Sequence, residues 1–92
     1  MNWRESTPSL AKFTKHAKEQ IAQRGLTQEE VISVISNPVK TVPTRANRLA
    51  SYGRVEGKYI VVIHEHEEDD ELVVTAMKVD RARLARFGFI EI

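Results

Sequence analysis

Two nearly continuous apolar runs, Tyr59 to Ile63 and Leu72 to Met77, constrain the fold of this 92-residue chain more than any other feature. Each is far shorter than the ~20 apolar residues that a membrane-spanning helix needs. Apolar runs without alternation are typical of central strands, whose faces other elements cover. We therefore expect two adjacent central strands in a sheet covered by helix on one face, and no membrane-spanning segment.

Two helices are expected before the sheet. Thr14 can cap the first, and Gly25 can end it in the left-handed conformation. The second runs from about Gln28 to Ser36, since Thr27-Gln28-Glu29-Glu30 has the pattern of a capping box and Asn37-Pro38 stops a helix. With so short a link between them, the two helices form a tight hairpin.

The remaining segments indicate strands and one short helix. The expected strands are Leu10–Phe13, Val39–Thr44, Arg48–Val55, Lys58–Glu65 and Leu72–Lys78, and the expected helix is Arg81–Phe87. A two-residue turn at Glu56-Gly57 would place Arg54 opposite Tyr59. The fold class is thus α+β: two N-terminal helices packed on a three- to four-stranded antiparallel sheet, with a short C-terminal helix. We expect a single domain over residues 1–92, with a loose lead-in at 1–9 and an acidic hairpin loop at 65–71.

The charge is segregated along the chain. Fourteen Lys and Arg against thirteen Asp and Glu give a net charge of +1, but six of the acids lie in residues 65–71. The rest of the chain then carries +7, which suits a polyanionic partner such as nucleic acid. The acidic run itself is a solvated hairpin tip in the simplest interpretation. No cysteine and no apolar leader are present, so we expect a cytoplasmic location.

The first helix has an unusual first turn. Lys15, His16 and Lys18 oppose the positive end of the helix dipole, as an anion bound there would explain. His16 and Arg24 share one helical stripe with Gln20, and a neutral imidazole at a helix start can act as a general base. A boundary histidine with a structural hydrogen bond explains His16 equally simply, and both interpretations stay open.

A second set of cations follows from the sheet and the last helix. Lys78 ends an apolar strand, where a long side chain can be held rigidly, and Arg83 and Arg86 share a helical face. Such a set can hold a phosphodiester if its members converge, and is otherwise a solvated basic surface. Its members are Arg54, Lys58, Lys78, Arg81, Arg83 and Arg86.

A metal site is the weaker interpretation of His64 and His66. They lie on one side of a strand beside Glu65 and Glu67, and divalent metals accept such ligands. No third ligand is fixed elsewhere, and pairs of this kind are mostly solvated strand ends. We assign neither a metal nor a cofactor to the chain. It also lacks a Gly-rich phosphate loop and a nucleophile-type turn.

The pattern over Phe13 to Lys78 resembles a bacterial family, domain of unknown function 4258. Its opening signature is matched by Thr14-Lys15-His16-Ala17, Ile21, Arg24-Gly25-Leu26-Thr27 and Glu30-Val31. Its second half is similar to Gly53-Arg54-Val55, Gly57-Lys58 and Val74-Thr75-Ala76-Met77. The resemblance implies a relation to the RelE/ParE-like superfamily, which includes the BrnT toxins, and hence a RelE-like fold.

For function, the resemblance implies that the chain is the toxin of a type II toxin–antitoxin pair and acts as a metal-independent RNA endonuclease. His16 and Arg24 match signature positions, Arg54 matches the glycine-arginine pair, and Lys78 and Arg81 resemble the basic residues after the last strand of BrnT-like toxins. Phe87 and Phe89 depart from the RelE pattern, since they offer no tyrosine hydroxyl. ParE-like members inhibit gyrase, so fold similarity does not fix the activity.

We therefore expect His16, Arg24, Arg54 and Lys78 to be catalytic. His16 would take the proton of an attacking 2′-hydroxyl while the three cations hold the phosphate. Nucleic acid would also contact Lys15, Lys58, Arg81, Arg83 and Arg86. The expected partners are a cognate antitoxin and RNA or the ribosome, with no membrane involved. The alternative is a non-catalytic basic module that binds nucleic acid or an acidic, antitoxin-like segment.

Overall fold

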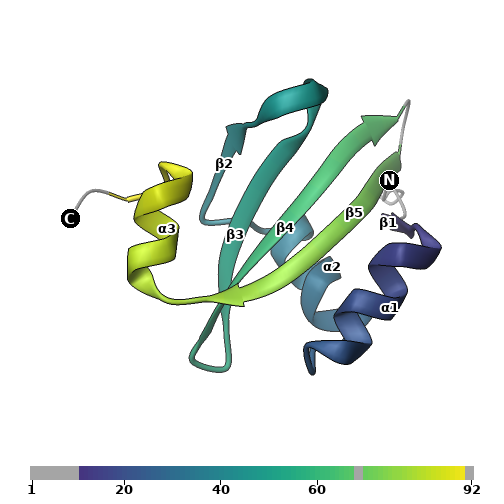
Figure 1. Ribbon diagram of the computed structural model, residues 1–92, viewed down its shortest axis with the longest axis horizontal. Helices are drawn as coiled ribbons and strands as arrows, with labels where there is room; N and C mark the ends of the chain where they lie inside the picture. Colours follow the sequence, from purple (N-terminus) through teal and green to yellow (C-terminus); the bar gives the residue numbers. More distant parts are fainter. Residues whose placement is uncertain (1–10, 68–69, 91–92) are drawn as a thin grey trace, which may run out of the picture.

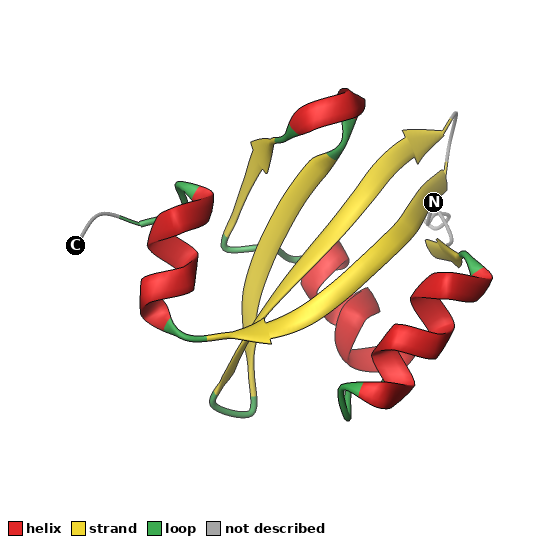
Figure 2. Cartoon of the chain, viewed as in Figure 1, coloured by secondary structure: helices red, strands yellow, loops and turns green. Residues whose placement is uncertain are grey.

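The computed structural model describes residues 11–67 and 70–90, which form an α+β fold as expected (Figures 1 and 2). A five-stranded sheet has the order β1 (Ala11–Phe13), β5 (Asp70–Val79), β4 (Lys58–Glu67), β3 (Leu49–Val55) and β2 (Lys40–Pro43). The helices are α1 (Lys15–Gln23), α2 (Gln28–Ser36) and α3 (Arg81–Phe87), with a short 3₁₀ segment, η2 (Arg45–Asn47). The expected lead-in at residues 1–9 lies outside the described residues.

The helix boundaries follow the predicted caps. The Thr14 hydroxyl accepts a hydrogen bond from the backbone N–H of Ala17 at 3.0 Å, and Thr27 and Glu30 complete a capping box, with both bonds at 3.0 Å. Gly25 has φ +73°, and the N–H of Leu26 reaches back to the Ile21 carbonyl at 2.9 Å. Local chemistry therefore sets both ends of α1.

Replacing Gly25 by alanine is expected to lower the free energy of unfolding by about 1 kcal/mol, because a Cβ strains a backbone held at positive φ. Urea denaturation of Gly25→Ala against the wild type measures the loss. Gln23→Ala, in the last turn of α1, is the control and should leave stability nearly unchanged. An unchanged midpoint for Gly25→Ala would show that this turn adopts another conformation in solution.

The central hairpin of β3 and β4 has the predicted register. Arg54 lies opposite Tyr59 and Tyr52 opposite Val61. The turn residues Glu56 and Gly57 have φ values of +52° and +81°, as a two-residue type I′ turn requires. The two apolar runs lie in β4 and β5, which confirms the prediction that they form adjacent strands of the sheet.

The sheet differs from the expected one in two respects. It has five strands, and it is mixed, because β1 pairs in parallel with the start of β5, from Ala11 opposite Glu71 to Phe13 opposite Val73. All other pairs are antiparallel. A three-residue strand shows no periodicity from which its partner could be predicted, and its parallel partner lies about sixty residues later in the chain.

The acidic segment is also different from the expected loop at 65–71. β4 continues to Glu67 and β5 starts at Asp70, so the acids belong mainly to strand ends. Several are paired: Glu65 with Arg48 at 2.8 Å, Asp70 with Lys12 at 3.0 Å, and Glu71 with two histidines. These partners hold three of the six acids at the strand ends.

Each face of the sheet buries its own apolar cluster. On one face α1 and α2 pack through Ala17, Ile21, Val31 and Val34 against the sheet. On the other face α3 and the residues after it pack through Leu84 and Phe89, together with Ala50, Tyr52 and Val61. The structure thus covers both faces, where we expected helix on one. No helix in the described part of the chain is long and apolar enough to cross a membrane.

One ion pair connects α2 to the sheet, and from it we predict how the stability of the fold depends on pH. Lys58 donates to Glu30 at 2.7 Å. This hydrogen bond, and then the one from the Thr27 backbone, lowers the pKa of Glu30 below its ordinary value of 4.5. A lowered folded-state pKa stabilises the fold above the unfolded-state pKa, and that stability is lost as pH falls through the folded value.

We expect Lys58→Met to raise the pKa of Glu30 toward its ordinary value, because it removes the largest cause of the lowering. The stability of this variant should then fall less than that of the wild type when the pH drops below about 4.5. An NMR titration of the Glu30 carboxyl carbon measures the pKa directly. Lys18→Met removes a cation from α1 and should leave the titration unchanged; equal midpoints in all three proteins would contradict the assignment.

Candidate nucleic-acid interface

Arg24 lies at the C-terminal end of α1 against the outer edge of β5. Its guanidinium Nη1 donates to the carbonyl oxygen of Ala76 at 2.8 Å and to Thr75 Oγ1 at 3.3 Å. The Thr75 hydroxyl in turn donates to Gln20 Oε1 at 2.5 Å. β1 pairs only with residues 71–73 of β5, so the edge of β5 at Thr75 and Ala76 is open to Arg24. The contacts fix one side of the guanidinium and leave its other N–H groups to a ligand.

Lys78 and Arg83 join Arg24 around one hollow. Arg24, Lys78 and Arg83, with Met77, line a hollow of about 330 Å³ at the C-terminal end of β5. Gly25 brings the helix end close to Lys78: a Cβ built on Gly25 would lie 3.9 Å from Lys78 Nζ. α1 and α3 thus approach the same strand end from the two faces of the sheet.

A second hollow adjoins the first and contains an aromatic ring. It measures about 300 Å³ and is lined by Arg83, Arg86 and Phe87, so Arg83 borders both hollows. The Phe87 ring lies 5.7 Å from Phe89, whose ring lies 4.6 Å from Tyr52. This stack holds Phe87 in place, half-buried at the surface. We call the two hollows together the basic cleft, formed by Arg24, Lys78, Arg83, Arg86 and Phe87.

Within residues 11–67 and 70–90, the cations of the basic cleft form no ion pair with a carboxylate. Among the described residues, no ion pair involves Arg24, Lys78, Arg83 or Arg86. The nearby acid Asp80 serves as the N-cap of α3, where its side chain accepts from the N–H of Arg83 at 2.9 Å. Lys12, Arg48 and Lys58, elsewhere on the molecule, are each paired with an acid. The cleft is therefore a place where an anion would meet unneutralised positive charge.

His16 and Lys15 lie away from the cleft. Both are exposed in the first turn of α1, and His16 precedes Arg24 by eight residues. At 1.5 Å per residue, that separates them by about 12 Å along the helix axis. Gln20 and Arg24 do share the predicted stripe, since both contact Thr75. Sharing a helical face thus does not bring His16 to the cations.

Three more predicted residues also lie outside the cleft. Arg54 is on β3, two strands from β5, where its guanidinium lies 5.6 Å from the Tyr59 ring centre. Lys58 is engaged by Glu30, and Arg81 is an exposed residue that lines neither hollow. Of the predicted site residues, the structure brings together Arg24, Lys78, Arg83 and Arg86.

The histidines predicted as strand-end residues have a different environment. His64 and His66 both direct Nδ1 at the Glu71 carboxylate, and His64 is buried. Within residues 11–67 and 70–90, no group of three or more His, Cys, Asp or Glu is placed to hold a metal ion.

Sequence reasoning missed Thr75 and Phe87. Thr75 gives no signal in the sequence, because its role depends on α1 lying beside β5. Phe87 does give one: it follows Arg83 by four residues, which places an aromatic ring beside a cation on one helical face. A cation–aromatic pair at this spacing, next to other basic residues, is a pattern typical of surfaces that bind single strands.

Comparison with known proteins decides the family. The model of the family described as Domain of unknown function (DUF4258) matches residues 13–78. The chain belongs to this family. No curated protein and no solved structure matches the chain. The DUF4258 match includes Arg24 and Lys78 and stops before Arg83, Arg86 and Phe87. The basic cleft therefore combines residues inside the family match with residues of the helix that follows it.

Proposed function

We propose that this DUF4258 protein binds single-stranded nucleic acid in the basic cleft. The observation that carries the proposal is the convergence of Arg24, Lys78, Arg83 and Arg86 beside the ring of Phe87, with no carboxylate partner for these cations among the described residues. Positive grooves next to aromatic side chains are the usual means of holding a single strand, since the cations take the backbone and the ring stacks a base.

Arg24 and Lys78 are suited to one phosphate. Arg24 is held by Ala76 and Thr75, so little side-chain freedom is lost when its remaining N–H groups bind phosphate oxygens. Lys78 adds a compact charge from the strand end. In the second hollow Arg83 and Arg86 would hold the next phosphate while a base stacks on Phe87. The two hollows together suit a segment of about two nucleotides.

The same geometry supports binding better than cleavage. Phosphodiester cleavage by a 2′-hydroxyl needs a base within hydrogen-bond reach of that hydroxyl. No histidine or carboxylate lines the cleft among the described residues, and His16 is about 12 Å away along α1. The non-catalytic alternative from the sequence is therefore the function that we favour.

The relation to RelE/ParE-like toxins remains part of the proposal. We propose that the chain acts in the bacterial cytoplasm as a toxin-like protein that holds RNA, with an acidic antitoxin-like segment competing for the basic cleft. The motif resemblance supports this, and so do the cleft cations, which form no ion pair with any residue that the structure describes. Induction in bacteria of the wild type and of Arg24→Glu/Lys78→Glu tests it: growth arrest should depend on the two cations. Arrest that is lost in His16→Ala alone, together with RNA cleavage in vitro, would favour the ribonuclease instead.

Fluorescence anisotropy with labelled 10-nucleotide oligomers tests the binding itself. Two phosphate contacts, one in each hollow, predict that the logarithm of the association constant falls with the logarithm of salt concentration with a slope of about −1.4. RNA and DNA of equal sequence are the two arms, and a base-paired duplex is the comparison. Tighter binding of the duplex would contradict the role of Phe87, and binding insensitive to salt would contradict the cleft as a phosphate site.

A further inference from the structure

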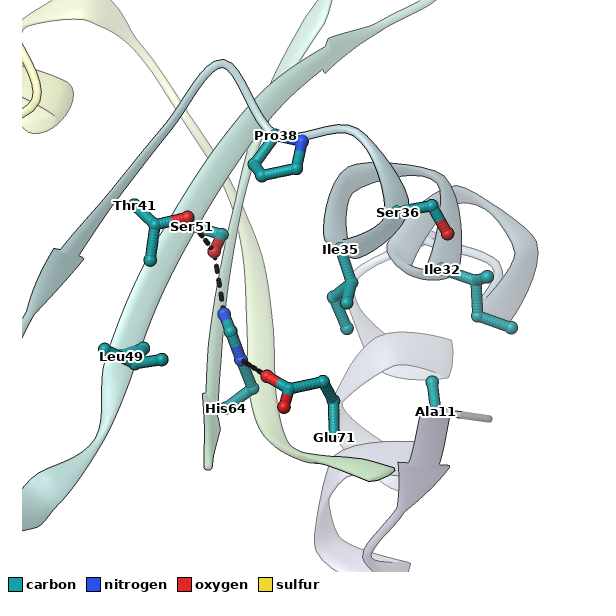
Figure 3. Close-up of a pocket in the computed structure, with 10 residues that line it drawn as sticks. All are labelled: Ala11, Ile32, Ile35, Ser36, Pro38, Thr41, Leu49, Ser51, His64 and Glu71. Atoms are coloured by element: carbon teal, nitrogen blue, oxygen red, sulfur yellow. Dashed lines mark hydrogen bonds and ion pairs between the residues drawn. The ribbon is translucent and has the colours of Figure 1, made fainter. Parts of the chain in front are cut away.

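A cavity separate from the basic cleft lies at the opposite end of β5, between α2 and the sheet (Figure 3). Its volume is about 520 Å³, within the range of sites for small organic molecules. Ile32 and Ile35 of α2 face Leu49 of β3 across it, and Ile32 is 40% exposed. Ser36 and Thr41 also line the cavity, together with Ser51, His64 and Glu71.

The floor residues form one hydrogen-bonded line across three neighbouring strands (Figure 3). Ser51 Oγ lies 2.7 Å from His64 Nε2, and His64 Nδ1 lies 2.6 Å from Glu71 Oε1. Ser51 and His64 are only 1% and 4% exposed. A β-bulge leaves Val74 without a partner opposite β4, which turns the start of β5 so that Glu71 faces His64.

The direction of the protons follows from the acceptors. A carboxylate only accepts, so His64 Nδ1 carries the proton and Nε2 offers its lone pair to the Ser51 hydroxyl. His66 Nδ1 binds the second oxygen of Glu71, which holds the carboxylate in place. Since Ser51 donates to His64, Thr41 Oγ1, at 2.7 Å, donates to Ser51 Oγ. A serine, a base oriented toward it and a carboxylate behind that base are the parts of an activated nucleophile.

We propose that Ser51, His64 and Glu71 form an acyl-transfer site that hydrolyses a small ester with an apolar acyl group. Ser51 Oγ adds to the ester carbonyl carbon as its proton passes to His64 Nε2. The tetrahedral intermediate expels the alcohol, which takes that proton, and leaves acyl-Ser51. Water then adds to the acyl carbon and gives a proton to His64 Nε2. The second tetrahedral intermediate releases the acid from Ser51 Oγ, which takes the proton back from His64.

The substrate class follows from the cavity. Ile32, Ile35 and Leu49 suit a short aliphatic acyl chain, and none of the described residues that line the cavity is a lysine or arginine that could bind an acid or phosphate. The site is independent of the basic cleft, because the two share no lining residue.

An alkyl fluorophosphonate and p-nitrophenyl butyrate test the proposal with the whole chain. Ser51 Oγ should displace fluoride and form one phosphonyl adduct, which tandem mass spectrometry locates on Ser51. Ser51→Ala should lose the adduct and reduce ester hydrolysis by about two orders of magnitude or more. Ser33→Ala, an exposed serine of α2 outside the cavity, should retain both. Glu71→Gln, a positioning residue, should lower kcat and leave KM nearly unchanged.

Two results would overturn the site. One is a folded wild type that forms no adduct on Ser51. The other is ester hydrolysis that is equal in the wild type and Ser51→Ala. If Ser51→Ala does not fold, adduct mapping on the wild type decides the question alone, since an adduct elsewhere or none at all contradicts the proposal.

Discussion

Reversing the charge of Arg24 and Lys78 together is expected to weaken binding of a single-stranded oligonucleotide by about 100-fold, or about 3 kcal/mol. Each side chain donates to a phosphate in the proposed complex, and a carboxylate in its place repels that phosphate. Anisotropy titration of Arg24→Glu/Lys78→Glu at constant salt measures the change. The Arg24 contacts to Ala76 and Thr75 are lost as well, so a thermal melt must show that the variant is folded.

The matched control also replaces one lysine and one arginine by glutamate, but far from the basic cleft in the strand order. Lys40→Glu/Arg45→Glu reverses two exposed cations on β2 and η2, at the other edge of the sheet. Charges separated by more than the ~8 Å Debye length at physiological salt are largely screened, so this variant should lose well under 10-fold. Equal losses in the two double variants would mean that nucleic acid senses only the net charge of the protein.

Leu84→Ala is expected to lower the free energy of unfolding by about 2–4 kcal/mol. Leu84 is 1% exposed and is the one buried residue of the seven-residue helix α3. A helix this short is marginal in isolation, so its position depends on Leu84 and the adjacent Phe89. Urea denaturation measures the loss, and Ala82→Ser, on the exposed side of α3, should stay within about 0.5 kcal/mol of the wild type.

The same variant has a second, functional consequence. Arg83, Arg86 and Phe87 are carried by α3, so a loosened helix should also weaken oligonucleotide binding under conditions where the protein is still folded. A loss of stability without any loss of affinity would show that α3 does not contribute to the interface.

Much of the fold could be predicted because its boundaries depend on local chemistry. Thr14, Thr27 and Asp80 cap the helices, and Gly25 and Gly88 end α1 and α3 at positive φ. Each of these signals acts within a few residues of the boundary. The register of the central hairpin is local in the same way, since its turn fixes it. The short strand expected at Leu10–Phe13 is present as β1, but its parallel pairing with β5 could not be predicted, because this pairing depends on the assembled sheet.

The candidate site was predictable only in part, for a geometric reason. The stripe on α1 correctly joined Gln20 to Arg24, but extending it to His16 ignored the rise of the helix. Arg54 was grouped with Lys78 as one of the cations of the sheet and the last helix, whereas the strand order places β4 between their strands. Conversely, α3 does bring Arg83 and Arg86 to the end of β5, which a sequence pattern alone cannot show.

The fold places acidic and basic residues at opposite ends of β5. β5 runs from the acidic end at Asp70 and Glu71 to the basic end at Lys78, about 30 Å for ten residues. Asp70, Glu65 and Glu71 are paired with Lys12, Arg48 and the histidines, whereas no ion pair in the described part of the chain involves the cations of the cleft. An approaching polyanion is therefore oriented toward the cleft and away from the hairpin tip.

The most direct test of nucleic-acid binding is a ¹⁵N–¹H NMR titration with a short single-stranded oligonucleotide. We predict amide shift changes concentrated at residues 24–25, 77–78 and 83–87, where the basic cleft lies. Changes centred instead on residues 15–18, around His16, or no localised changes at saturating oligonucleotide, would contradict the cleft as the binding site.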